Sequence, residues 1–147
     1  MKVLFRVVLV MVLTAVSVTF LCLDCMAFDP SGEWNFSLSN SKVKGMCPMG
    51  GNSNGVLEIE NRGGGQYTLR YISGMTCSPA QVCILHGSCN GSDCMFRNSV
   101  SVDNQGGKVA NSADLHFDSD AASGPGKSQY IHPAMSCSWD FTMTLSR

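Results

Sequence analysis

Short segments in which apolar and polar residues alternate recur along most of this 147-residue chain. We expect strands at 33–39, 56–60, 66–73, 81–88, 94–102, 108–117, 129–131 and 138–146. A period of two places the apolar side chains on one face of a strand, whereas a helix needs a period of 3.6. No stretch shows a sustained helical pattern. The sequence therefore predicts an all-β fold with seven or eight strands.

Glycine and asparagine lie between these segments at positions typical of hairpin turns. A triple glycine occupies 63–65, and Asn90-Gly91 follows the fourth segment. Glycine adopts a positive φ without steric cost, and Asn-Gly is a common two-residue hairpin turn. Short turns of this kind join neighbouring strands into an antiparallel meander.

The first and last expected strands, 33–39 and 138–146, both carry an aromatic inner face. If these two strands pair with each other, the sheet has no exposed edge. We therefore expect a closed antiparallel meander barrel, with a β-sandwich as the alternative.

The first 27 residues have the layout of a secretory signal peptide. Lys2 and Arg6 precede an apolar run at 7–23, and Ala27 ends a small-residue cleavage site. An uncleaved membrane anchor is the rival interpretation, but a run of 17 residues is short for a spanning helix. We expect cleavage after Ala27, which leaves one secreted or periplasmic domain at 28–147 without a membrane segment.

Six of the eight cysteines follow the predicted signal peptide. They are Cys47, Cys77, Cys83, Cys89, Cys94 and Cys137. An even number of cysteines in an exported chain indicates disulfides, and these spacings lack the short C-x2-C pairs of zinc sites.

Geometry favours one set of pairs, in which Cys47–Cys137 joins the two strands that close the barrel. Cys89–Cys94 then spans the Asn-Gly turn, and Cys77–Cys83 is the third pair. An alternative set pairs Cys83 with Cys94 and Cys77 with Cys89. Either set gives a disulfide-stapled β domain.

Gly32-Glu33-Trp34 opens the first expected strand, and Arg147 follows the last one. This arrangement resembles lipocalin-like and avidin-like (calycin-type) small β-barrels, in which G-x-W opens the first strand and a basic residue near the end of the last strand packs against that tryptophan. The resemblance covers these positions only. It implies a barrel in which Arg147 packs against Trp34, and it implies no particular ligand.

Charge and motifs exclude several classes of function. The formal net charge of −1 provides no basic field for nucleic acid. No nucleophile motif such as G-x-S-x-G is present, so we expect a protein that is not an enzyme. His116 and Asp118 share one strand face with two more aspartates, which is a weak candidate for a metal site in a metal-assisted enzyme. A solvated outer face explains this pattern better, so we expect neither a metal nor a cofactor.

Loops held by a rigid scaffold often carry binding residues. Long loops are expected at 41–54, 73–81 and 118–128. Candidate binding residues come from these loops and from the aromatic strand faces: Met46, Met49, Met75, Trp34, Tyr67 and Tyr71. The aromatic side chains can line a cavity or fill a core, and a filled core is favoured in a barrel of this size.

These features predict a non-catalytic binding protein, either a small inhibitor or a ligand carrier, that acts through the barrel loops or the barrel mouth. Its partner would be another protein or a small apolar ligand. The alternative is a structural or surface-interaction subunit of an envelope or secreted assembly. Asn35 and Asn90 begin N-glycosylation sequons, which matter only in a eukaryotic secretory pathway.

Overall fold

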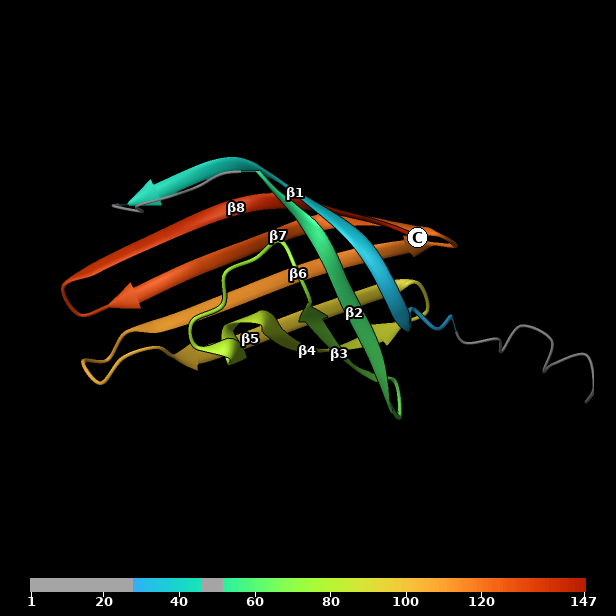
Figure 1. Ribbon diagram of the computed structural model, residues 1–147, viewed down its shortest axis with the longest axis horizontal. Coiled ribbons are helices and arrows are strands. Elements are labelled where there is room, and N and C mark those ends of the chain that lie inside the picture. The colour runs from blue at the N-terminus through green and yellow to red at the C-terminus, as the bar shows by residue number, and fades with distance from the viewer. Residues whose placement is uncertain (1–27, 46–51) are drawn as a thin grey trace, which may run out of the picture.

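The computed structural model describes residues 28–45 and 52–147 (Figure 1). These residues form a closed barrel of eight strands in which each strand pairs with its sequence neighbours and β1 pairs with β8. The elements are β1 (Gly32–Gly45), β2 (Ser53–Gly63), β3 (Gln66–Tyr71), the 3-10 helix η1 (Ala80–Cys83), β4 (Ile84–Asn90), β5 (Asp93–Ser101), β6 (Lys108–Asp118), β7 (Ala121–His132) and β8 (Met135–Ser146). All pairings are antiparallel. The predicted meander barrel is confirmed, and the β-sandwich alternative is wrong. The predicted signal peptide lies outside the described residues.

The predicted loop at 118–128 is wrong, because β7 occupies most of it. Glycine and proline disfavour strands, and this segment contains Gly124, Pro125 and Gly126. β6 and β8 nevertheless pair with β7 on both sides. Pro125, which has no N–H, pairs with Thr142 of β8 and falls in a gap of the register with β6. Pairing with two neighbouring strands therefore overrides the local preference.

Two more element bounds differ from the prediction. The expected strand at 81–88 begins as η1, so β4 starts only at Ile84. The expected loop at 41–54 is shorter, because β1 continues to Gly45. Its register with β8 shifts between Asn40 and Lys42, as at a β-bulge.

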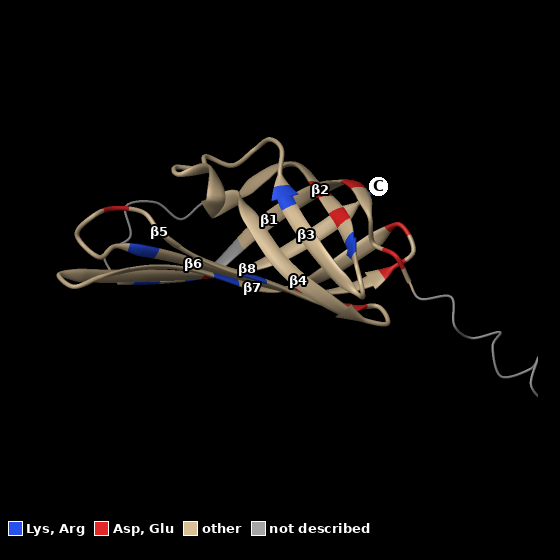
Figure 2. Ribbon diagram, turned by 90° about the horizontal axis from the view of Figure 1, so that it is seen from below, with Lys and Arg blue, Asp and Glu red and all other residues tan. Residues whose placement is uncertain are grey.

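The strands differ in length, and this difference gives the barrel walls of unequal height. β1 pairs with β2 only over Gly32–Leu38, while its second half runs beside β8. The pairings of β5 to β8 likewise continue past the ends of β3 and β4. These strands project beyond the barrel as a flat extension (Figures 1 and 2).

The barrel is filled at the end where β1 begins. The Phe117 ring centroid lies 5.3 Å from that of Phe28 and 5.4 Å from that of Trp34. Trp34 is only 1% exposed, and its indole N–H donates a hydrogen bond to the Pro30 carbonyl oxygen at 2.8 Å. The guanidinium carbon of Arg147 lies 4.2 Å from the centroid of the Trp34 ring, as the resemblance implied. We call this end the closed end.

Two disulfides are present among the described residues, Cys77–Cys83 and Cys89–Cys94. They confirm two of the three favoured pairs and exclude the alternative set. Cys137 is also disulfide-bonded, while its predicted partner Cys47 lies outside the described residues. Disulfides indicate an oxidising, non-cytoplasmic compartment. In the described ranges, no helix has the length and apolar character needed to cross a membrane.

Candidate functional site

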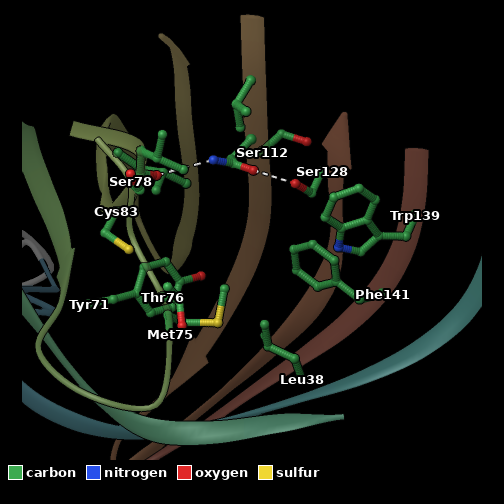
Figure 3. A pocket seen from close by; sticks show the side chains of 14 residues that line it. Leu38, Tyr71, Met75, Thr76, Ser78, Cys83, Ser112, Ser128, Trp139 and Phe141 are labelled. Carbon is green, nitrogen blue, oxygen red and sulfur yellow. Dashed lines mark hydrogen bonds between the residues drawn. The ribbon is translucent and has the colours of Figure 1, made fainter. Parts of the chain in front are cut away.

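A pocket opens at the end of the barrel opposite the closed end, and Figure 3 shows the side chains that line it. Its volume is about 260 Å³. The described residues that line this mouth pocket are Leu38, Tyr71, Met75, Thr76, Ser78, Val82, Cys83, Leu85, Val109, Asn111, Ser112, Ser128, Trp139 and Phe141. None of them is charged. The pocket exists because β6 to β8 rise beyond β3 and β4, so the core does not fill the space between them.

Residues 72–83, here called the mouth loop, lie beside this space and are fixed to the tall wall by asparagine side chains. The Asn98 side-chain amide donates hydrogen bonds to the carbonyl oxygens of Val82 and Ile84, both at 2.9 Å. The Asn111 amide donates a third, to Val82 at 3.1 Å. Ser128 Oγ in turn donates to Asn111 Oδ1 at 2.6 Å. The pairing of β4 with β5 ends at His86 and Arg97. Beyond that point, these side-chain hydrogen bonds hold the mouth loop in place of strand pairing.

Sequence reasoning missed Asn98, Asn111 and Ser128 as site residues. Asn98 and Asn111 are cross-strand partners on the inner face, and Phe96 and Val100 flank Asn98 on that same face. The signal was therefore present in the sequence. A polar residue in an inward row of apolar residues must find hydrogen-bond partners inside the barrel.

The other end of the mouth loop is anchored to β2. Ser53 Oγ donates a hydrogen bond to the Gly74 carbonyl oxygen at 2.6 Å. The Val56 N–H donates to Ser73 Oγ at 3.1 Å. The Cys77–Cys83 disulfide closes the loop between these two anchored ends. The loop is thus a fixed part of the pocket wall.

Tyr71 and Trp139 each bring to the pocket a hydrogen-bond donor that has no partner among the described residues. The Tyr71 ring packs edge-on against Phe36 at 5.0 Å between centroids, and its hydroxyl points into the pocket (Figure 3). Burial raises the pKa of Tyr71 above its ordinary value, so the hydroxyl remains protonated and able to donate. The second donor is the indole N–H of Trp139, on the opposite wall.

The structure separates the candidate binding residues into three groups. Tyr71 and Met75 line the mouth pocket. Trp34 and Tyr67 lie in the hydrophobic core, where they are 1% and 6% exposed. The two methionines of the 46–51 segment lie outside the described residues. The pocket is therefore lined by two of the predicted binding residues together with other residues of the barrel wall. One of these is Trp139, which the alternation pattern places on the aromatic inner face of its strand.

Of the two weak metal candidates, His116 and Asp118, the first is engaged in a pairwise contact on the outer face. His116 Nδ1 lies 2.7 Å from Asp93 Oδ1 on the neighbouring strand. Asp114 pairs with Arg97 at 2.5 Å. The described part of the chain contains no group of three or more metal-ligating side chains, and Asp118 belongs to none.

No family model matches the chain, and no curated protein matches it. The interpretation of the mouth pocket therefore rests on its geometry and chemistry.

Proposed function

We propose that the protein is a secreted or periplasmic, non-catalytic binding protein that holds a small, uncharged, largely apolar ligand in the mouth pocket. The chemical composition of the pocket lining is the observation that carries this proposal. Aromatic and aliphatic side chains such as Leu85, Trp139 and Phe141 surround the pocket, and the described lining has no charged group. A charged ligand would lose hydration there without a compensating partner, which costs several kcal/mol. Small-molecule sites are commonly concave, mostly apolar and supplied with a few polar groups.

The unpartnered donors favour a ligand that carries a hydrogen-bond acceptor. Tyr71 and Trp139 face the pocket from opposite walls (Figure 3). A carbonyl or ether oxygen of the ligand would satisfy either donor. The volume of about 260 Å³ lies near the lower end of the range for small-molecule pockets, so the ligand is small.

The same lining favours binding over catalysis. General acid–base catalysis needs a group such as a carboxylate, an imidazole or an ammonium within hydrogen-bonding reach of the reacting atoms. The described residues of the mouth pocket supply none of these groups. The disulfides and the predicted signal peptide support a secreted or periplasmic location.

Two dyes with the same scaffold test the proposal. N-phenyl-1-naphthylamine is uncharged and fluoresces more strongly in apolar surroundings, and 8-anilino-1-naphthalenesulfonate adds a sulfonate to that scaffold. We expect saturable one-to-one binding of the uncharged dye and binding of the sulfonated dye that is at least about tenfold weaker. Equal affinities, or no saturable binding of the uncharged dye, would contradict the proposal.

A second candidate function is binding of another protein through the mouth loop. Ile72 is 53% exposed and Met75 is 40% exposed on this anchored loop. Exposed apolar residues on a rigid loop can act as interface anchors. Incubation with a panel of secreted hydrolases tests this function. We expect inhibition of one of them by the wild-type protein and loss of that inhibition in Ile72→Ser; unchanged activity across the panel would count against it.

A further inference from the structure

A second hollow lies on the outer surface of the barrel and shares no lining residue with the mouth pocket. This outer groove has a volume of about 360 Å³ and runs over β2, β3, β4 and β5. The residues that matter here are Arg62, Thr68, Arg70, His86 and Ser99. Among the described lining residues no carboxylate is present, and two are arginines.

The strand register explains why these side chains converge. Thr68 on β3 lies directly opposite His86 on β4, and Arg70 follows Thr68 on the same face. Arg62 reaches in from β2, where its Nε donates a hydrogen bond to Thr68 Oγ1 at 3.2 Å. His86 Nδ1 lies 3.4 Å from the same hydroxyl oxygen. Three strands thus bring basic or hydrogen-bonding groups to one place.

Arg70 is the unusual member of this group. Its Nε is shielded from solvent and has no hydrogen-bond partner among the described residues. Arg97, also on the outer surface, is different: its guanidinium bonds to Asp114 at 2.5 Å and to the Phe96 carbonyl oxygen at 2.8 Å. A buried polar group without a partner costs about 1–3 kcal/mol, and more when it is charged. A buried polar group in a folded protein normally has a hydrogen-bond partner, and the described residues supply none to Arg70 Nε.

Glu58 and Glu60 are the acidic residues nearest to the two arginines. Glu60 is already paired with Arg62. Glu58 lies opposite Arg70 in the register, but the two side chains form no ion pair in the structure. The Arg70 guanidinium is therefore available to an external partner.

We propose that the outer groove is a binding site for a small oxyanion, that is, the carboxylate, sulfate or phosphate group of a ligand. Arginine presents a planar fork of N–H donors that matches two oxygens of such a group. Arg70 provides this fork, and the Ser99 hydroxyl offers a further donor at the rim. Arg62 lines the groove as well, but Glu60 already matches its charge. This site is independent of the ligand proposed for the mouth pocket.

The test is an NMR titration of the folded protein that monitors the arginine Nε–H signals. Sodium phosphate, sodium sulfate or sodium acetate is added at fixed pH, with sodium chloride adjusted to keep the ionic strength constant. We expect a saturable shift of the Arg70 Nε–H signal with at least one of the three anions. The order of their affinities identifies the preferred oxyanion group.

Two matched variants make the test specific. Arg70→Gln should weaken anion binding at least about tenfold, because it removes the bidentate partner. Arg97→Gln should change the affinity less than about twofold, because Arg97 is paired elsewhere. Shifts that rise linearly with concentration and affect all arginines alike would show an adventitious ion only and overturn the proposal. Saturable binding that appears only in Glu58→Gln would also overturn it, since Glu58 would then be the partner of Arg70 in solution.

Discussion

Gly126 of β7 lies directly opposite Phe141 of β8, and the Phe141 ring covers the space that a side chain at position 126 would occupy. The nearest atoms to an added Cβ are three ring carbons of Phe141. Since Phe141 lines the mouth pocket, the missing side chain at Gly126 helps to shape that pocket.

We expect Gly126→Ala to destabilise the barrel by about 1–3 kcal/mol, because overpacking forces the ring or the strand to move. The displaced ring should also weaken binding of N-phenyl-1-naphthylamine. Urea unfolding and dye titration measure the two effects. Ser123→Ala, at an exposed position of the same strand, is the control and should change neither. Wild-type stability in Gly126→Ala would contradict this packing argument.

The sequence predicted the barrel because its alternation and its turns agree with each other. The alternation predicts the inward-facing rows that contain Trp34 and Tyr71, and the Asn90-Gly91 pair predicts a turn. The resemblance to small β-barrels predicts the contact between Arg147 and Trp34. Strand pairing depends on such rows, since a slip of one residue would turn every apolar side chain outward.

The rest of the architecture depends on contacts that no local pattern contains. β7 was missed because Gly124 and Pro125 disfavour a strand that two neighbours nevertheless stabilise. The sequence predicted binding at the barrel loops or the barrel mouth, but most of the lining of the mouth pocket was missed because the pocket results from unequal strand lengths. The register shift in β1 and the binding of the mouth loop by the Asn98 and Asn111 side chains are equally absent from any local pattern.

The packing of Arg147 on Trp34 should contribute measurably to stability. Arg147 also donates a hydrogen bond through Nη2 to the Ser31 carbonyl oxygen at 2.7 Å. We expect Arg147→Gln to lower the free energy of unfolding by about 1–2 kcal/mol, because a cation–π contact and a charged hydrogen bond are both lost. Arg147→Lys, which keeps the charge without the planar group, should be intermediate. A Gln variant as stable as wild type in urea unfolding would refute this role.

The turn between β5 and β6 should make stability depend on pH. Asp103 Oδ1 accepts hydrogen bonds from the backbone N–H groups of Gly107 and Gln105, both at 2.8 Å. These bonds, that of Gly107 first, hold the pKa of Asp103 below its ordinary value. The unfolded chain therefore binds the proton more readily, so the stability contributed by ionised Asp103 is present above about pH 4 and is lost as pH falls through the folded pKa.

Asp103→Asn keeps the shape of the side chain but removes its titration. The stability difference between wild type and this variant should be largest above about pH 4 and should shrink toward pH 2. Urea midpoints measured across this range provide the test. A difference that is constant with pH, or that grows under acid conditions, would be inconsistent with the hydrogen-bonded carboxylate.

The two disulfides should affect ligand binding differently although they close loops of similar length. Their sequence separations are 6 for Cys77–Cys83 and 5 for Cys89–Cys94. Replacing either pair by alanines should cost about 2 kcal/mol of stability, because each closes a short loop in the unfolded chain. Only the Cys77–Cys83 double variant should weaken binding of N-phenyl-1-naphthylamine, because that pair fixes the mouth loop. Equal dye affinities in both double variants would show that the loop plays no part in binding.

The most direct test of the central claim is to fill the mouth pocket from its rim and measure binding of N-phenyl-1-naphthylamine. Val109 is half-buried on the inner face of β6 and lines the pocket, so Val109→Trp should fill it without disturbing the core. The matched control is Ile131→Trp, because Ile131 lies on the outer face of β7 and is 48% exposed. We expect wild type and Ile131→Trp to bind one dye molecule with similar affinity, and Val109→Trp to bind it at least about tenfold more weakly at unchanged stability. Equal dye binding by all three proteins would contradict the claim that the barrel mouth is the binding site.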